Sequence, residues 1–301
     1  MTAETVEDLT SAEPWHSQDP TDSDRSAQRR YVLRRLRRSR TFVIGLGVVV
    51  FWVACALVAP SVTPYNPYKV DPLAALQAPS TSHWFGTDNL GRDVFARTLA
   101  GARPVLIIAP LATLLCLLGG AVVGLISAYM GGLVDEVSMR AVDVLLALPV
   151  IVAAMFALSL VGSSPLVVIG VIAVLFMPVV ARTVRSAALT ESEREYVQAA
   201  TLRGERASFT MTFEILPNIL SPIIVEGSIR LGYAVLTAAT ISFLGFGLQP
   251  PSPDWGLTVA QQQGVIQVAP WSTFFPALAL GTLVVGANLA ADGLRQALLR
   301  D

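Results

Sequence analysis

Several stretches of more than twenty residues in this 301-residue chain contain no charged side chain. Of its 43 charged residues, 15 lie before residue 41, and the other 261 residues carry only 28. Soluble globular domains contain roughly 25% charged residues along their length, whereas this chain contains 14%. The pattern is typical of an integral membrane protein, and it leaves nucleic-acid binding without support.

Six segments are apolar and long enough to cross a hydrocarbon core of about 30 Å, which requires about 20 helical residues. The sequence 162–165, Gly-Ser-Ser-Pro, predicts a turn that divides the longest apolar run into two helices. Glycines at 119, 120 and 124 favour close helix–helix contact. The expected spans are 41–62, 104–130, two within 137–181, 217–247 and 271–291.

Arginine distribution predicts the orientation of these spans, because cytoplasmic loops are enriched in Lys and Arg. With the N-terminus inside, the inner segments hold sixteen arginines. The outer segments then hold only four cations: Lys69, Arg92, Arg97 and Arg103. We therefore expect both termini to be cytoplasmic.

The polar ends of the chain are expected to flank a membrane core. Residues 1–24 are acidic and rich in Ser and Thr, which is typical of disorder. Residues 25–40 are basic, as expected of a collar that contacts anionic headgroups. The expected organisation is a cytoplasmic tail (1–40), a first span (41–62), an outer loop (63–103), a five-helix core (104–297) that includes an inner loop (182–217), and a cytoplasmic end (298–301).

Residue types exclude several catalytic and metal-binding classes. Cys55 and Cys116 each lie in an apolar run, so neither a disulfide framework nor a thiolate metal site is expected. His16 and His83 lie in polar segments, which excludes an intramembrane hydrolase triad or H-E-x-x-H site. Lys69, the single lysine, is not part of a phosphate-binding loop. We expect no catalytic residue, metal or cofactor on this chain.

The outer loop contains two acid-first pairs four residues apart, Asp88 with Arg92 and Asp93 with Arg97. Thr87 is suited to cap a helix there. Such pairs stabilise an exposed helix by about 0.2–0.5 kcal/mol each. Apolar residues cover the opposite arc, so we expect a short amphipathic helix on the outer membrane interface.

The longest inner loop is also the most charged segment after the tail. Residues from Glu195 predict a short helix that Gly204 ends, and Pro217 suits the first turn of the next helix. By itself, this composition also fits a solvated connector.

Few ionisable residues lie within the spans, where a charge is expensive and usually faces a partner or a cavity. Asp143 lies about one turn from Arg140, and Glu226 precedes Arg230 by four residues. Glu226 and Arg230 fit a structural pair and a translocation surface equally well.

Three motifs resemble those of permease subunits of bacterial ATP-binding cassette importers for dipeptides, oligopeptides or nickel. The first is His-x-Phe-Gly-Thr-Asp-x-x-Gly-Arg-Asp at 83–93, followed by Gly-Ala-Arg at 101–103. The others are Gly-Gly-Leu-Val-Asp to Leu-Leu at 131–146 and Ile-Ser-Phe-Leu-Gly to Trp-Gly at 241–256. The resemblance covers nearly all of residues 30–297, and the combination of motifs resembles the second permease subunit of the pair, the one with the short outer loop.

The inner loop resembles the E-A-A…G…I-L-P loop of these permeases, with Gln198 in place of the motif's glutamate. The resemblance implies a coupling helix that docks in a cleft of the ATP-hydrolysing subunit. Ala199, Ala200 and Leu202 would form its apolar knob, and Glu195 and Arg203 would fix its register. The implied coupling residues are Glu195, Tyr196, Gln198, Ala199, Ala200, Leu202, Arg203 and Gly204.

The resemblance implies an all-α membrane protein of type I importer architecture with six transmembrane helices. It would act by alternating access in the bacterial cytoplasmic membrane, without being an enzyme itself. Its partners would be a homologous permease, two subunits that bind ATP and Mg, and an extracytoplasmic peptide-binding protein. A nickel-chelate permease stays open as an alternative. An ion-coupled secondary transporter is less favoured because no internal repeat is detectable.

Overall fold

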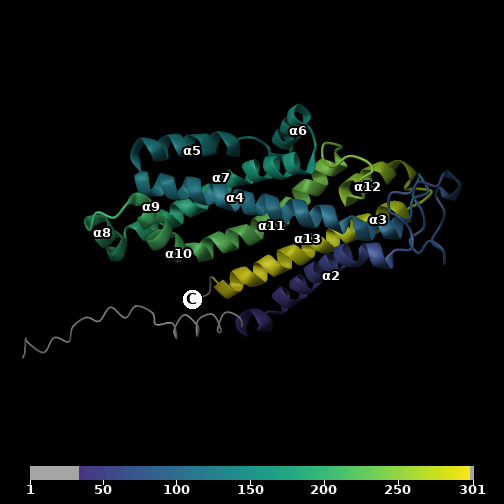
Figure 1. The fold of residues 1–301 in the computed structure, drawn as a ribbon, viewed down its shortest axis with the longest axis horizontal. Coiled ribbons are helices and arrows are strands. Elements are labelled where there is room, and N and C mark those ends of the chain that lie inside the picture. The colour runs from purple at the N-terminus through teal and green to yellow at the C-terminus, as the bar shows by residue number, and fades with distance from the viewer. Residues whose placement is uncertain (1–33, 299–301) are drawn as a thin grey trace, which may run out of the picture.

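The computed structural model describes residues 34–298 as an elongated bundle of helices (Figure 1). One end of the long axis carries the short helix α8 (Glu195–Leu202), and the other carries α12 (Trp255–Gln262). We call these the α8 end and the α12 end. Most of the expected tail (1–40) and chain end (298–301) lies outside the described residues.

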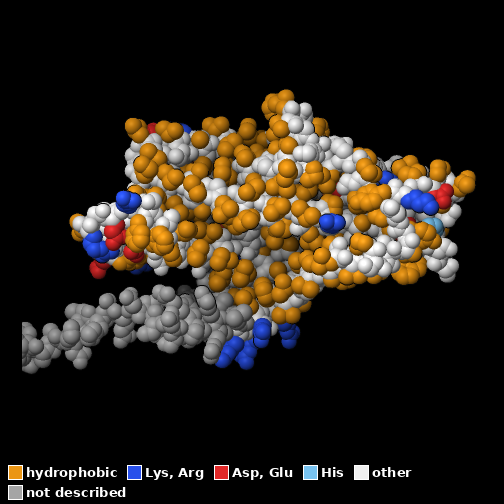
Figure 2. Space-filling model, in the orientation of Figure 1, with side chains coloured by type: hydrophobic (Ala, Val, Ile, Leu, Met, Phe, Trp, Pro, Cys, Tyr) orange, Lys and Arg blue, Asp and Glu red, His pale blue; other side chains and the backbone are white. Residues whose placement is uncertain are grey.

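Five helical segments in the described part are long and apolar enough to cross a membrane. On the face shown in Figure 2, a broad apolar band covers the bundle, and most visible acidic side chains lie near its two ends. The segments are α2 (Arg40–Val62), α3 (Val94–Ala100) with α4 (Ala102–Met130), α7 (Pro165–Ser192), α11 (Leu220–Phe243) and α13 (Trp271–Leu298).

The remaining predicted span is bent. Helices α5 (Gly132–Leu146) and α6 (Val150–Val161) meet at 92°, so they make a sixth span only if the bent pair is counted as one. Pro149 stands at the bend, where it lacks an N–H donor and disfavours helical backbone at the residue before it. The turn predicted at 162–165 is confirmed, because α6 ends at Val161 and Ser164 caps α7.

Helix α4 packs closely along α7. A Cβ on Gly120 would lie 2.5 Å from the Cβ of Val180, and a Cβ on Gly124 would lie 2.6 Å from the carbonyl oxygen of Ala181. Small residues are therefore required at this contact, as the sequence predicts.

The first and last spans pack against each other. A Cβ on Gly45 of α2 would lie 2.3 Å from the backbone nitrogen of Ala290 in α13. Trp52 donates its Nε1–H to the hydroxyl oxygen of Thr282 at 3.1 Å. These contacts hold α2 against α13 at the side of the bundle (Figure 1).

Short helical elements connect the spans at both ends. The chain after α8 is helical from Ala207, earlier than the start predicted at Pro217. These elements are η3 (Pro72–Ala74), α9 (Ala207–Phe209), the π-helix η4 (Thr210–Ile215), α10 (Leu216–Asn218) and η5 (Gln263–Val265).

Candidate functional site: the α8 loop and two charged clusters

Helix α8 forms where the sequence predicts it, between α7 and the π-helix η4. Gly204 has a φ of +74°, a backbone conformation that favours glycine and ends the helix. Glu195 and Gln198 are exposed, and the Gln198 amide donates to the carbonyl oxygen of Glu193 at 3.1 Å. Arg203 pairs with Glu205 at 2.6 Å, so its guanidinium is engaged within the loop itself.

The two faces of α8 differ sharply. Val197 and Ala200 are buried against this chain, and Ala200 is 0% exposed. Leu202, in contrast, is 88% exposed at the tip of the loop, and Ala199 is half-buried. The prediction that Ala200 belongs to an outward knob is therefore wrong, because its face packs on the chain's own core. Leu202 is the apolar side chain that α8 offers to a partner.

Two further exposed aromatic side chains, which the sequence did not single out, follow α8 in α9 and η4. Phe209 and Phe213 stack with ring centroids 4.9 Å apart, and they are 44% and 67% exposed. They lie one helical turn apart, and this spacing was the signal that could have identified them.

The hydroxyl of Tyr196 joins α8 to the helices on both sides of it. It donates to the Glu191 carboxylate near the end of α7, and it accepts the Nδ2–H of Asn218 in α10 at 2.9 Å. Partial burial and the neighbouring Glu191 carboxylate raise the pKa of the Tyr196 hydroxyl above its ordinary value. The hydroxyl therefore stays protonated at physiological pH and keeps its role as a donor.

An open cleft of about 600 Å³ lies beside this network. Its walls come from α7 on one side and from α10 and the start of α11 on the other. Glu191 and Asn218, the two partners of Tyr196, both line it.

Glu226 and Arg230 form the pair that their spacing predicts, with Oε1 and Nε 2.7 Å apart. Their side chains are only 12% and 15% exposed, and the guanidinium also lies 5.0 Å from the ring centroid of Tyr233. A charged pair thus sits inside the bundle on α11, and its role stays a prediction.

Asp143, which lies about one turn from Arg140 in the sequence, pairs with Arg182 of α7. A second pair, Asp135 with Arg185, repeats the arrangement. Both pairs join α5 to α7, which explains why Asp135 and Asp143 are tolerated on α5.

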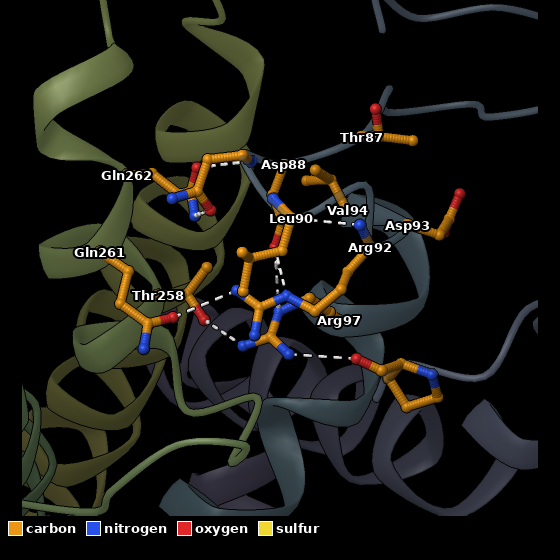
Figure 3. A network of polar contacts seen from close by, with 12 residues as sticks. Thr87, Asp88, Leu90, Arg92, Asp93, Val94, Arg97, Thr258, Gln261 and Gln262 are labelled. Atoms are coloured by element: carbon orange, nitrogen blue, oxygen red, sulfur yellow. Dashed lines mark hydrogen bonds and ion pairs between the residues drawn. The ribbon is translucent and has the colours of Figure 1, made fainter. Parts of the chain in front are cut away.

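At the α12 end, three of the four predicted residues, Asp88, Arg92 and Arg97, form a buried polar cluster (Figure 3). Asp88 lies between two arginines, 2.6 Å from the Nε of Arg92 and 3.8 Å from the Nε of Arg97. All three side chains are at most 3% exposed. Asp93 instead caps α3 and faces the Nδ1 of His83 at 2.8 Å.

This cluster joins segments that are far apart in the sequence. Arg97 donates to the carbonyl oxygens of Pro67 and Ser252 at 3.0 and 3.1 Å. Arg92 donates to the side chain of Gln261 in α12 at 3.2 Å (Figure 3).

The predicted interfacial helix at this position is therefore wrong. The chain from Thr87 to Asp93 is a tight turn, and Gly91 has a φ of +71° that interrupts a helix. Helix α3 starts only at Val94 and leads directly into α4. The charged pairs are buried tertiary contacts, not exposed helical ones.

Comparison with known proteins identifies the family. Residues 120–301 match the model of the binding-protein-dependent transport system inner membrane component, and residues 27–79 match the N-terminal transmembrane domain of oligopeptide transport permease C. The chain is 36% identical to the dipeptide transport system permease protein DppC of Alkalihalophilus pseudofirmus, over 89% of this chain and 88% of that protein.

Two further relatives are similar over most of their length. The glutathione transport system permease protein GsiD of Pectobacterium atrosepticum is 36% identical, over 92% of both chains. The di/tripeptide transport system permease protein DppC of Pseudomonas aeruginosa is 35% identical, over 84% of this chain and 86% of that protein. With its apolar helices and type I permease fold, the chain belongs to the multi-pass inner membrane permeases of binding-protein-dependent ATP-binding cassette importers, which work with an ATPase and a substrate-binding protein.

Proposed function

We propose that this permease passes peptides across the bacterial cytoplasmic membrane by alternating access. The three relatives described above are named for dipeptides, for di- and tripeptides, and for glutathione, which is itself a tripeptide. These names share a short-peptide cargo, so short peptides are the cargo class that we assign to this chain. The chain provides one half of the pathway, and a homologous permease provides the other.

In this proposal, two partner subunits that bind ATP and Mg hydrolyse ATP to drive transport. An extracytoplasmic peptide-binding protein delivers the cargo. The observation that carries the ATPase contact is the exposure of Leu202 on a helix anchored by Val197 and Ala200. A short, firmly packed helix with one protruding apolar side chain can transmit movement of the ATPase to the bundle without deforming. Helix α8 is thus the coupling helix, with Leu202 at the contact.

Leu202→Asp tests this assignment. Burying a leucine contributes about 1.5–3 kcal/mol, so the variant should weaken ATPase binding by about ten-fold or more. The matched control is Leu73→Asp, because Leu73 is 95% exposed in η3, outside the α8 loop. The measurements are co-purification of the ATPase and ATP-dependent peptide uptake into proteoliposomes. Wild-type values for L202D would refute the contact, and uptake without ATP would refute the ATP-driven class.

Both termini are cytoplasmic in this proposal, in keeping with the sixteen-to-four arginine and lysine asymmetry. Ser82 and Ser208 are exposed. Ser208 belongs to α9, which lies near the α8 end, and Ser82 precedes α3, which lies near the α12 end (Figure 1). A cysteine at Ser82 should react with an impermeant maleimide on intact cells, and one at Ser208 only after permeabilisation. Labelling of the Ser208 variant on intact cells would reverse the orientation.

A further inference from the structure

The side chains of α8 differ in how far along the chain their hydrogen bonds reach. In the part of the chain that the structure describes, the Thr201 hydroxyl bonds within α8, and the Arg203 guanidinium bonds to Glu205 just after it. The Gln198 amide reaches only the end of α7. Among the hydrogen bonds of these α8 side chains, only those of Tyr196 reach both α7 and α10.

The Tyr196 hydroxyl connects the two walls of the cleft beside it. At this level about 600 Å³ of open space separates α7 from α10 and the start of α11, although α7 and α11 pack against each other elsewhere. Glu191 stands on one wall and Asn218 on the other, and the Tyr196 hydroxyl bonds to both. The hydroxyl therefore bridges the two walls at this level.

The Tyr196 hydroxyl acts as a donor in one of these hydrogen bonds and as an acceptor in the other. The hydroxyl has one proton, which it donates to Glu191, and it accepts a proton from the Asn218 amide. The Asn218 amide also donates to the carbonyl oxygen of Glu214 at 2.7 Å, which ties it to η4. A displaced α8 would stretch bonds to both helices at once.

We propose that Tyr196 is a positioning residue whose hydroxyl transmits movement of α8 to α7 and to α10, which leads into α11, and so couples ATP hydrolysis to opening of the pathway. The proposal rests on the proposed function of α8 and deepens it. Val197 and Ala200 hold α8 on the bundle, and the Tyr196 hydroxyl links that helix to α7 and α10.

Tyr196→Phe in the assembled importer tests the proposal, because it removes the hydroxyl and keeps the ring. The measurements are ATPase co-purification, ATP hydrolysis and peptides transported per ATP in proteoliposomes. ATPase association and hydrolysis should persist, and peptides per ATP should fall at least about five-fold, because the variant loses two hydrogen bonds and one ordinary hydrogen bond alone corresponds to about that factor. Tyr68→Phe is the control, because Tyr68 is exposed outside the α8 loop and no hydrogen bond of its hydroxyl is found among the described residues.

A double-mutant comparison sharpens the test. Glu191→Gln and Asn218→Ala should each lower peptides per ATP, and neither should lower it further when Tyr196 is already phenylalanine. An unchanged ratio in Y196F with normal ATPase binding would overturn the transmission role and leave the coupling helix intact. Loss of ATPase binding in Y196F would also overturn it, because the hydroxyl would then only hold α8 in shape. Failure of the proposed function is seen separately, as normal ATPase binding in L202D.

Discussion

Replacing Asp88 with alanine should remove much of the stability of the α12 end. The carboxylate accepts the Nε–H of Arg92 at 2.6 Å and the backbone N–H groups of Leu90 and Arg92, both at 2.9 Å. It also lies 3.8 Å from the Nε of Arg97. The substitution therefore leaves two buried guanidinium groups and two backbone donors without this carboxylate.

The size of the effect follows from these contacts. Breaking a buried ion pair by removing one partner costs about 3–5 kcal/mol, and each unsatisfied backbone donor adds about 1 kcal/mol. The sum is about 5–7 kcal/mol, and at about 2–4 °C per kcal/mol for a chain of this size the apparent melting temperature should fall by about 10–30 °C. The melting temperature of the Asp88→Asn variant should fall less, because the asparagine side-chain oxygen can still accept the two backbone N–H groups.

The assay is the fraction of monodisperse protein after heating in detergent, measured by size-exclusion chromatography. The matched control is Asp71→Ala, which removes an exposed carboxylate that accepts the N–H of Leu73 at 3.2 Å. The control should melt within about 2 °C of the wild type, as expected of a surface change. An Asp88→Ala variant as stable as the control would refute the buried cluster as a source of stability.

Two further predictions concern the spans. Gly45→Ala should lower the melting temperature, because its Cβ would lie 2.3 Å from a backbone atom of α13, whereas Gly47→Ala meets open space and should leave it unchanged. Equal melting of the two variants would contradict the α2–α13 contact. Glu226→Gln alone should destabilise the bundle by leaving Arg230 unpaired, and Glu226→Gln with Arg230→Met should restore much of the stability. Uptake of acidic, neutral and basic peptides by the double variant decides the role, since equal recovery for all three excludes a pathway function.

The spans could be predicted because uncharged runs and turn residues are local signals. Gly162 and Pro165 mark a real turn, and Gly204 marks a real helix end. The bend at Pro149 could not be predicted in the same way. Pro110 and Pro178 lie inside continuous helices of this chain, so a proline alone does not say whether a membrane helix bends.

The candidate sites depended more on tertiary structure. The spacing of Asp88 and Arg92 predicts their pairing, but Gln261 lies 169 residues away from Arg92, so burial of the pair has no local signal. The same limit explains the error at Ala200. Helical spacing gives the faces of an eight-residue helix, but only the packing of its neighbours decides which face turns inward.

The contact between α2 and α13 has a consequence for how the protein is made. Trp52 and Thr282 are 230 residues apart, so their hydrogen bond joins the first span to leave the ribosome with the last. At about 5–20 residues per second, the first span waits about 10–50 s in the bilayer before its partner emerges. We expect chains stalled before α13 to expose the glycine face of α2 to lipid and to be the forms that membrane quality-control proteases remove. Pulse-labelled, C-terminally truncated chains would show this as faster turnover than the full-length protein.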